Sequence, residues 1–230
     1  MSEETQPPPS GPDLIVAGER VEEGRSPFGR RSTLNRILEA ATGVFANKGV
    51  ANTTVADMLG SAGISRRTFY KYFRNKEDVL RRLFEVYADS MLEGIQDAVK
   101  QGPSLVAKMH GAIDCYLDGH ATYGELIRVL EQEAIRTESS LAPARKAFQA
   151  AVVGIFDRQV RQAQARRIDP LVIYSVLWAL EGISLHLLTE TPCANGDIER
   201  TKRVMYSVAE RVIGTDGDQE TPLPLAESTP

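Results

Sequence analysis

Large apolar residues recur in this chain every three or four positions, and that period restricts the fold to packed amphipathic helices. The pattern is clear from Ser32 to Gly49 and again from Asn75 to Lys100. No segment has the alternating apolar and polar residues of a half-buried β-strand. The chain has 230 residues, 42% of them hydrophobic, which is enough for one large domain or two modest ones. We therefore predict an all-α protein of about nine helices.

Helix boundaries can be placed from residues with strong terminal preferences. Ser, Thr and Asn side chains cap free N–H groups at helix starts, and glycine accepts the left-handed conformation at helix ends. In chain order, the expected cap and stop residues are Ser32, Gly49, Thr53 or Thr54, Gly63, Ser65 and Asn75. Beyond Lys100 we expect further helices over 103–120, 123–137, 141–166, 170–190 and 196–213.

The two ends of the chain differ in composition from the helical region. Residues 1–30 and 214–230 are rich in proline, glycine and acidic residues, so we predict that both are disordered tails. The N-terminus lacks the basic start and apolar run of a secretory signal. The nearest candidate for a membrane span, residues 171–188, contains Glu181, which disfavours insertion. We expect a cytoplasmic protein with no membrane contact.

Charge is distributed unevenly along the chain. The net charge is −4, yet residues 25–82 contain 12 Lys and Arg against 4 Asp and Glu, which makes this block +8. Residues 83–230 contain 14 basic against 21 acidic residues. A small basic unit joined to a larger acidic one indicates that only the basic unit meets a polyanion.

The basic residues gather around the stretch GISRRTFYKYF, residues 63–73. A regular helix turns by about 100° per residue, and on such a helix the two sides of this stretch differ in chemistry. One side carries Arg66, Arg67, Tyr70, Lys71 and Arg74. The other side carries Thr68, Phe69, Tyr72 and Phe73. We expect the two phenylalanines to anchor the helix on the core and the cations to project outward.

Two short helices joined by a glycine-containing turn, with cations on the second, form the helix-turn-helix arrangement that enters the DNA major groove. Arginine pairs bidentately with guanine, so we expect Arg67 to read bases. Ser65 and Thr54 lie at helix starts, where a hydroxyl can bind phosphate beside free N–H groups, and Lys76 adds a positive charge. The simpler interpretation, a charged helix that only meets solvent, is disfavoured by the caps, the preceding short helix and the local charge.

The segment TTVADMLGSAGISRRTFYKYFRNKEDVL resembles the DNA-binding region of the TetR family of transcriptional regulators. The matching positions are Thr54-Val55, Ala62 to Ser65, Thr68 to Tyr70, Phe73 and Lys76-Glu77. The resemblance covers about residues 32–82 and implies an all-helical homodimer, in which a three-helix DNA-binding unit joins a ligand-binding domain through the fourth helix. The phosphate contacts that it implies fall on Thr54, Thr68, Tyr70, Tyr72 and Lys76. The sequence-reading positions that it implies are Arg66, Arg67 and Lys71.

On this basis we divide the chain into a helix-turn-helix DNA-binding domain, residues 31–76, and a ligand-binding and dimerisation domain, residues 77–213. The segment 170–190 is apolar nearly all round, so one face can serve the subunit core and another a partner. Together with 196–213 it would form an isologous four-helix interface. Such a dimer places two recognition helices about one DNA turn, roughly 34–36 Å, apart and predicts a pseudo-palindromic operator.

The segments 103–120, 123–137 and 141–166 are expected to enclose a chamber for a small hydrophobic or amphipathic effector. Candidate lining residues are Met109, His110, Tyr116, Tyr123, Phe148, Phe156 and Trp178. Taken singly, each of these residues fits a core position better than a ligand contact. His110, His120 and His186 lack metal-ligand spacing, so we predict neither a metal site nor a cofactor.

We find no nucleophile elbow, phosphate-binding loop or zinc-protease motif, and we predict that the protein is not an enzyme. The predicted function is sequence-specific regulation of transcription, as a repressor that an effector releases from DNA. One alternative is a helical small-molecule-binding or redox-sensing protein with secondary DNA binding, in which Cys115 supplies the thiol. A further alternative is an architectural protein that binds DNA without sequence preference.

Overall fold

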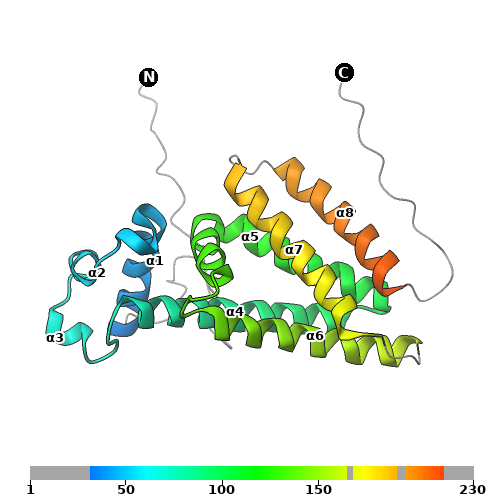
Figure 1. The fold of residues 1–230 in the computed structure, drawn as a ribbon, viewed down its shortest axis with the longest axis horizontal. Coiled ribbons are helices and arrows are strands. Elements are labelled where there is room, and N and C mark those ends of the chain that lie inside the picture. Colours follow the sequence, from blue (N-terminus) through cyan, green and yellow to red (C-terminus); the bar gives the residue numbers. More distant parts are fainter. Residues whose placement is uncertain (1–31, 165–167, 191–194, 215–230) are drawn as a thin grey trace, which may run out of the picture.

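The computed structural model describes residues 32–164, 168–190 and 195–214, and their regular structure is entirely helical (Figure 1). The helical elements in these ranges are α1 (Thr33–Asn52), α2 (Val55–Ala62), α3 (Arg66–Phe69), α4 (Lys76–Gln101), α5 (Leu105–Ile135), α6 (Ala142–Gln164), α7 (Pro170–Glu190) and α8 (Asn195–Ile213). The predicted all-α class is confirmed. Cys193 and the two expected tails, except Gly214, lie outside the described residues.

The predicted caps are confirmed, because each cap side chain accepts a hydrogen bond from the backbone three residues later. Ser32, Ser65 and Asn75 accept from the N–H groups of Asn35, Thr68 and Asp78, respectively. At α2 the structure selects Thr54 over Thr53. Gly49 and Gly63 both have positive φ, 72° and 60°, which L-residues with a side chain rarely adopt.

Three helix boundaries differ from the sequence prediction. The first helix was expected to stop at Gly49, but α1 continues to Asn52 across a non-helical backbone at Gly49. The predicted helices 103–120 and 123–137 form one continuous element, α5, which is interrupted by a non-helical backbone at Gly124. The third helix is shorter than the nine-residue wheel used above, because α3 ends at Phe69 and a turn follows.

The long helix α4 connects the two parts of the molecule (Figure 1). Its N-terminal half packs with α1 and α3 through a cluster that includes Phe45, Phe69 and Leu83, each fully buried. Its C-terminal half continues the same core through Met91 and Ile95 toward α5. The helix therefore contributes side chains to the core of both parts.

Helix α7 is apolar on several faces, as predicted, and one of them is exposed. Leu171 and Trp178 are 62% and 49% exposed, although the opposite face packs into the core. Residues Pro170–Leu188 also have the length and composition of a membrane-spanning helix, but 33% of that window is buried inside the structure. Glu181 on the buried side is ion-paired with Arg145. This pairing is typical of a helix that packs against protein.

Candidate nucleic-acid interface and ligand pockets

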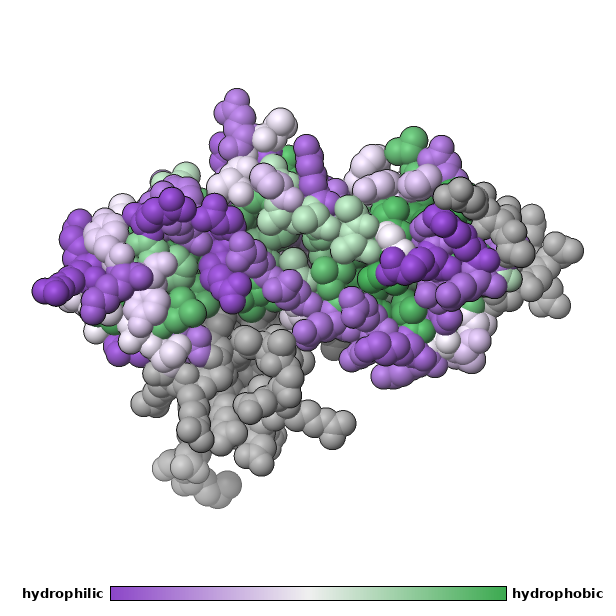
Figure 2. Space-filling view, turned by 90° about the horizontal axis from the view of Figure 1, so that it is seen from below, coloured by the Kyte–Doolittle hydropathy of each residue, from purple (hydrophilic) through white to green (hydrophobic). Residues whose placement is uncertain are grey.

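The turn that includes α3 presents a group of unpaired cations. Arg66, Arg67 and Lys71 are exposed, and none of them has an acidic partner within the described ranges. The neighbouring Arg74, by contrast, bonds to Asp78 with a distance of 3.1 Å between Nε and Oδ2. Hydrophilic side chains cover much of this end of the molecule, and apolar ones show between them farther along (Figure 2). The free cations are therefore the ones available to an external anion.

Phe69 anchors the helix that carries these cations on the core. Its side chain is fully buried and packs edge-on against the ring of Tyr70, with 5.5 Å between ring centroids. Phe73 is buried beside it, as predicted. The backbone tightens after Phe69, where the N–H of Tyr72 donates to the Phe69 carbonyl at 2.9 Å.

This tightening corrects the predicted orientation of Tyr72. The helical wheel placed Thr68 and Tyr72 on the inward side, but Tyr72 is 47% exposed and Tyr70 49% exposed. Thr68 is partly buried, in agreement with the wheel. The wheel was wrong at Tyr72 because α3 ends at Phe69, so 100° per residue no longer describes the chain beyond it. Both tyrosine hydroxyls consequently lie on the same exposed turn as Lys71.

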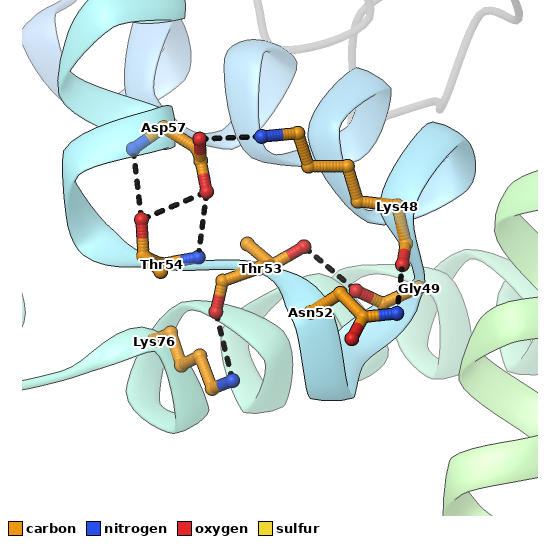
Figure 3. Close-up of polar contacts among 7 residues, drawn as sticks. All are labelled: Lys48, Gly49, Asn52, Thr53, Thr54, Asp57 and Lys76. Atoms are coloured by element: carbon orange, nitrogen blue, oxygen red, sulfur yellow. Dashed lines mark hydrogen bonds and ion pairs between the residues drawn. The ribbon is translucent and has the colours of Figure 1, made fainter.

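Two of the hydroxyls predicted at phosphate positions belong to helix caps. The Thr54 hydroxyl donates to Asp57 Oδ2 at 2.8 Å and accepts from the Asp57 N–H, while Asp57 also accepts from the Thr54 N–H (Figure 3). Lys48 donates to the other oxygen of Asp57 at 2.5 Å, and this hydrogen bond is the largest cause that lowers the pKa of Asp57 to about 2. Ser65 similarly caps α3 and shares a hydrogen bond of 2.9 Å with the Thr68 hydroxyl.

Lys76 occupies a position that the sequence did not indicate. Its amine donates to the Thr53 carbonyl at 2.8 Å (Figure 3) and to the carbonyls of Val50 and Ala51 at 2.7 and 3.3 Å. These carbonyls lie at the end of α1, where a positive charge also stabilises the helix dipole. Lys76 thereby ties the start of α4 to the junction of α1 and α2, and its predicted phosphate contact stays a prediction.

An apolar pocket lies in the C-terminal part of the molecule. It is lined by side chains of α4 to α8, and Met109, Tyr116 and Phe156 of the predicted set are among them. The empty volume is about 490 Å³, part of it open to solvent. Nearly all the lining side chains are aliphatic or aromatic, as in small-molecule sites.

The other predicted lining residues are not brought to this pocket. His110 bonds through Nε2 to Glu210 at 2.6 Å and stacks on Tyr206, with 4.0 Å between ring centroids. Trp178 lies on the exposed face of α7. Phe148 lines a second pocket instead. The side chain of Tyr123 lies outside the described residues. The sequence pattern identified these residues as apolar helix positions but could not tell which face of each helix turns toward the chamber.

The second pocket shares Tyr116 with the first and is called the polar pocket here, because ionisable side chains lie among its aromatic and aliphatic lining residues. Its polar lining residues include Tyr87, Glu131, Arg145 and Glu181, none of which was predicted. A charged residue within an otherwise apolar stripe, such as Glu181 in α7, is the sequence signal that could have located this pocket. Burial raises the pKa of both Tyr87 and Tyr116 well above the ordinary tyrosine value. Burial also raises the pKa of Glu181, against the opposing effects of Gln149 and Arg145.

Cys115 does not have the surroundings of a redox sensor. The thiol is partly buried, and its Sγ atom lies 3.9 Å from Met91 Sδ. Burial raises the pKa of the Cys115 thiol, and the negative charges of Asp118 and Asp114 nearby raise it further. Because the thiolate is the reactive form, the redox-sensing alternative gains no support at this position. Across the described ranges, no three His, Cys, Asp or Glu residues gather in a metal-binding arrangement.

The exposed cations, the capped short helices and the linking helix α4 are the geometry of a helix-turn-helix unit. Residues 37–83 match the family model described as "Bacterial regulatory proteins, tetR family". Residues 37–83 are therefore a DNA-binding domain of the TetR type. The TetR resemblance inferred from residues 53–80 is thus confirmed.

Curated relatives extend the match beyond this unit. The fatty acid metabolism regulator protein of Bacillus subtilis is 30% identical over 80 residues, which are 35% of this chain and 41% of that protein. The transcriptional activator FasR of Mycolicibacterium smegmatis is 21% identical over 192 residues, covering 78% of this chain and 87% of that protein. The chain thus spans less than half the length of the first relative and most of the second.

A solved TetR-type structure has the same overall fold. The regulator FadR of Bacillus subtilis, determined in complex with stearoyl-CoA, superposes with a TM-score of 0.66 at 20% identity. The match covers 77% of this chain and 96% of that chain. At this level of identity the likeness shows the fold, and it includes the C-terminal helices that carry the two pockets.

Proposed function

We propose that this protein is a cytoplasmic, homodimeric transcriptional regulator of the TetR family that binds a pseudo-palindromic operator and is released by a small apolar or amphipathic effector. The observation that carries the proposal is the set of exposed, unpaired cations held on α3 and its turn by buried Phe69. A group of cations on a rigid, narrow support is what major-groove reading requires.

The residues divide into two roles. We assign base reading to Arg66, Arg67 and Lys71, with Arg67 foremost. Phosphate contacts are assigned to Thr54, Ser65, Thr68, Tyr70 and Tyr72, which lie around the same surface. Lys76 was predicted to contact phosphate as well, but its amine donates to the carbonyls of Val50 and Thr53, so we assign it a structural role. Thr54 and Ser65 sit at exposed helix starts, where an anion meets the positive end of the helix and the cap hydroxyl together.

The exposed face of α7 supports dimerisation of the domain comprising residues 77–213. Leu171, Ser175, Trp178 and Gly182 are all exposed and recur at spacings of four, three and four, so they share one side of the helix. Two large exposed apolar residues, Leu171 and Trp178, with small residues between and beyond them, are typical of an interface with a second copy. Pairing along it would set the separation of the two α3 turns.

The apolar pocket supports an effector with an apolar body. Its lining contains Ile95 of α4, and α4 also begins at Lys76 beside the DNA-binding unit. A ligand that spreads the pocket would therefore move the helix that positions α3. Relatives point to the same chemistry, because one is named a regulator of fatty acid metabolism and another was solved with stearoyl-CoA. The ligand needs a differential affinity of a few kcal/mol between the two states.

Selection of bound sequences from a randomised duplex pool, at about 150 mM salt, tests the DNA-binding part of the proposal. We expect an enriched pseudo-palindrome with half-sites about one helical turn apart. Folded dimer that retains all duplexes equally would instead support the architectural alternative. A reporter gene under the selected operator then tests direction, because repression predicts lower expression with the regulator and recovery with its effector.

A further inference from the structure

The polar pocket lies against the apolar pocket, and the Tyr116 side chain lines both. It is formed by side chains of α4, α5, α6 and α7, with an empty volume of about 330 Å³. The pocket is smaller than the apolar one, and the carboxylates of Glu131 and Glu181 and the Tyr87 hydroxyl offer polar contacts to one compact group.

One carboxylate oxygen in this pocket has no partner. Glu131 Oε1 accepts from the Tyr116 hydroxyl at 2.7 Å and lies 2.7 Å from His120 Nε2. Its second oxygen, Oε2, is buried and makes no hydrogen bond within the described residues, and the same is true of the Tyr87 hydroxyl. Glu131 and Tyr87 are only 9% and 4% exposed. Buried polar atoms are normally paired, so both atoms have capacity for a further partner.

The charges around Glu131 decide which partner fits. Arg145 is ion-paired with Glu181, whose two oxygens also lie 2.9 Å from Gln149 Nε2. His120 uses Nε2 toward Glu131, and its Nδ1 lies 2.6 Å from the Tyr116 carbonyl. The Arg145 guanidinium of the pocket is therefore already engaged, while the acceptor Glu131 Oε2 is not, and the neutral Tyr87 hydroxyl can accept as well as donate. A ligand carboxylate would meet Glu131 and Glu181 without a free cation to offset them.

We propose that the polar pocket is the head-group subsite of the effector, and that it selects a hydrogen-bond donor such as a hydroxyl, an amide N–H or an ammonium group over a carboxylate. The apolar part of the same molecule occupies the pocket on the other side of Tyr116. This inference rests on the proposed function, since it specifies the ligand that acts on that regulator.

Three ligands with one tail and different heads test the selection: 1-decanol, kept below its solubility limit, and decylamine and decanoate, kept below their micelle concentrations, all at pH 7.4. Binding to the full-length dimer is measured by isothermal titration calorimetry. We expect decanol or decylamine to bind at least about tenfold more tightly than decanoate, a difference of about 1.4 kcal/mol. Tighter binding of decanoate, or equal binding of all three, overturns the proposal.

The variant Glu131→Gln tests whether Glu131 carries the selection. An amide can still accept from Tyr116 but turns an N–H₂ donor toward the ligand, so the preference for donor heads should be lost or reversed. Glu133→Gln is the matched control, because Glu133 lies on the same helix and pairs with Arg136 outside the pocket. It should leave the ratio of affinities unchanged. An unchanged ratio in the Glu131 variant contradicts the proposal.

The variant Tyr87→Phe covers the case in which Glu131→Gln does not fold. Loss of an unpartnered buried hydroxyl should leave the melting temperature of the free protein unchanged or raise it. The same change should weaken decanol binding severalfold, and undiminished binding would refute a ligand contact by Tyr87. Selection of bound sequences from the randomised duplex pool tests DNA binding independently of these ligand titrations. Head-group selection without DNA binding would reject the proposed regulator alone, and DNA binding without any ligand binding would reject the subsite alone.

Discussion

Replacement of Lys76 by alanine separates two roles that the same amine could have. In the structure, Nζ makes two short hydrogen bonds to the partly buried carbonyls of Val50 and Thr53 and a longer one to the exposed Ala51 carbonyl. A hydrogen bond with a charged donor contributes about 1.5–3 kcal/mol, but water can replace part of it at a half-exposed position. We therefore expect a loss of about 2 kcal/mol in the free energy of unfolding.

Thermal and chemical denaturation measure that loss. For a chain of this size, about 2 kcal/mol corresponds to a decrease of roughly 4–8 °C in the melting temperature. Lys71→Ala is the matched control, because Lys71 is exposed and has no acidic partner in the described ranges. Its melting temperature should stay within the range of ordinary surface substitutions, about 0.5 kcal/mol either way.

The salt dependence of operator binding measures the other role. Each phosphate contact adds about 0.9 to the slope of log affinity against log salt, so Lys71→Ala should reduce the slope of a dimer by about 1.8 if Lys71 reaches phosphate. Because all three donors of Lys76 face carbonyls, we expect its alanine variant to keep the wild-type slope. A stable Lys76→Ala protein with a slope reduced by about 1.8 would refute the tether and restore the phosphate assignment.

Three further predictions concern the DNA contact, the dimer and pH. Arg67→Ala should weaken binding to the selected operator by about 1–3 kcal/mol and to random duplexes far less; equal weakening in a titration of both would mean that Arg67 contacts phosphate. Trp178→Glu should dissociate the dimer in sedimentation velocity, because it places a charge in the exposed apolar face of α7, and an intact dimer would exclude that face. The low pKa of Asp57, about 2 against an ordinary 3.8, means that its contribution to stability is present above about pH 4 and is lost as pH falls toward 2. In urea titrations, Asp57→Asn should therefore show its full deficit at pH 7 and a smaller one near pH 2.5, and a constant deficit would contradict the role of the charge.

The helix-turn-helix unit could be placed from the sequence because its signals are local. Each cap bond joins residues three positions apart, so Ser32, Thr54, Ser65 and Asn75 could be recognised without knowledge of the rest of the fold. The buried positions of Phe69 and Phe73 followed from spacing alone. The orientation of Tyr72 did not follow, because the wheel assumed that the helix continues beyond Phe69, whereas α3 ends at that residue.

In the C-terminal half, the residues that line the pockets could not be predicted from the sequence. Periodicity identified apolar helices there, but Trp178 lies on an outer face, and His110 turns to Glu210 instead of the chamber. Whether a residue lines the pocket depends on how five helices are rotated about their axes relative to one another. The sequence of a single helix does not specify that rotation.

The sequence by itself therefore determined the helical class, the capped DNA-binding unit and the family of that unit. These features depend on contacts within a few residues and on one strongly patterned segment. Only the tertiary structure showed that Lys76 donates hydrogen bonds to carbonyls at the end of α1, more than twenty residues away in the chain. Only the tertiary structure likewise showed that Glu131 of α5 and Glu181 of α7 line the same pocket. Contacts of this kind depend on packing in three dimensions, and the pattern of a single helix does not specify them.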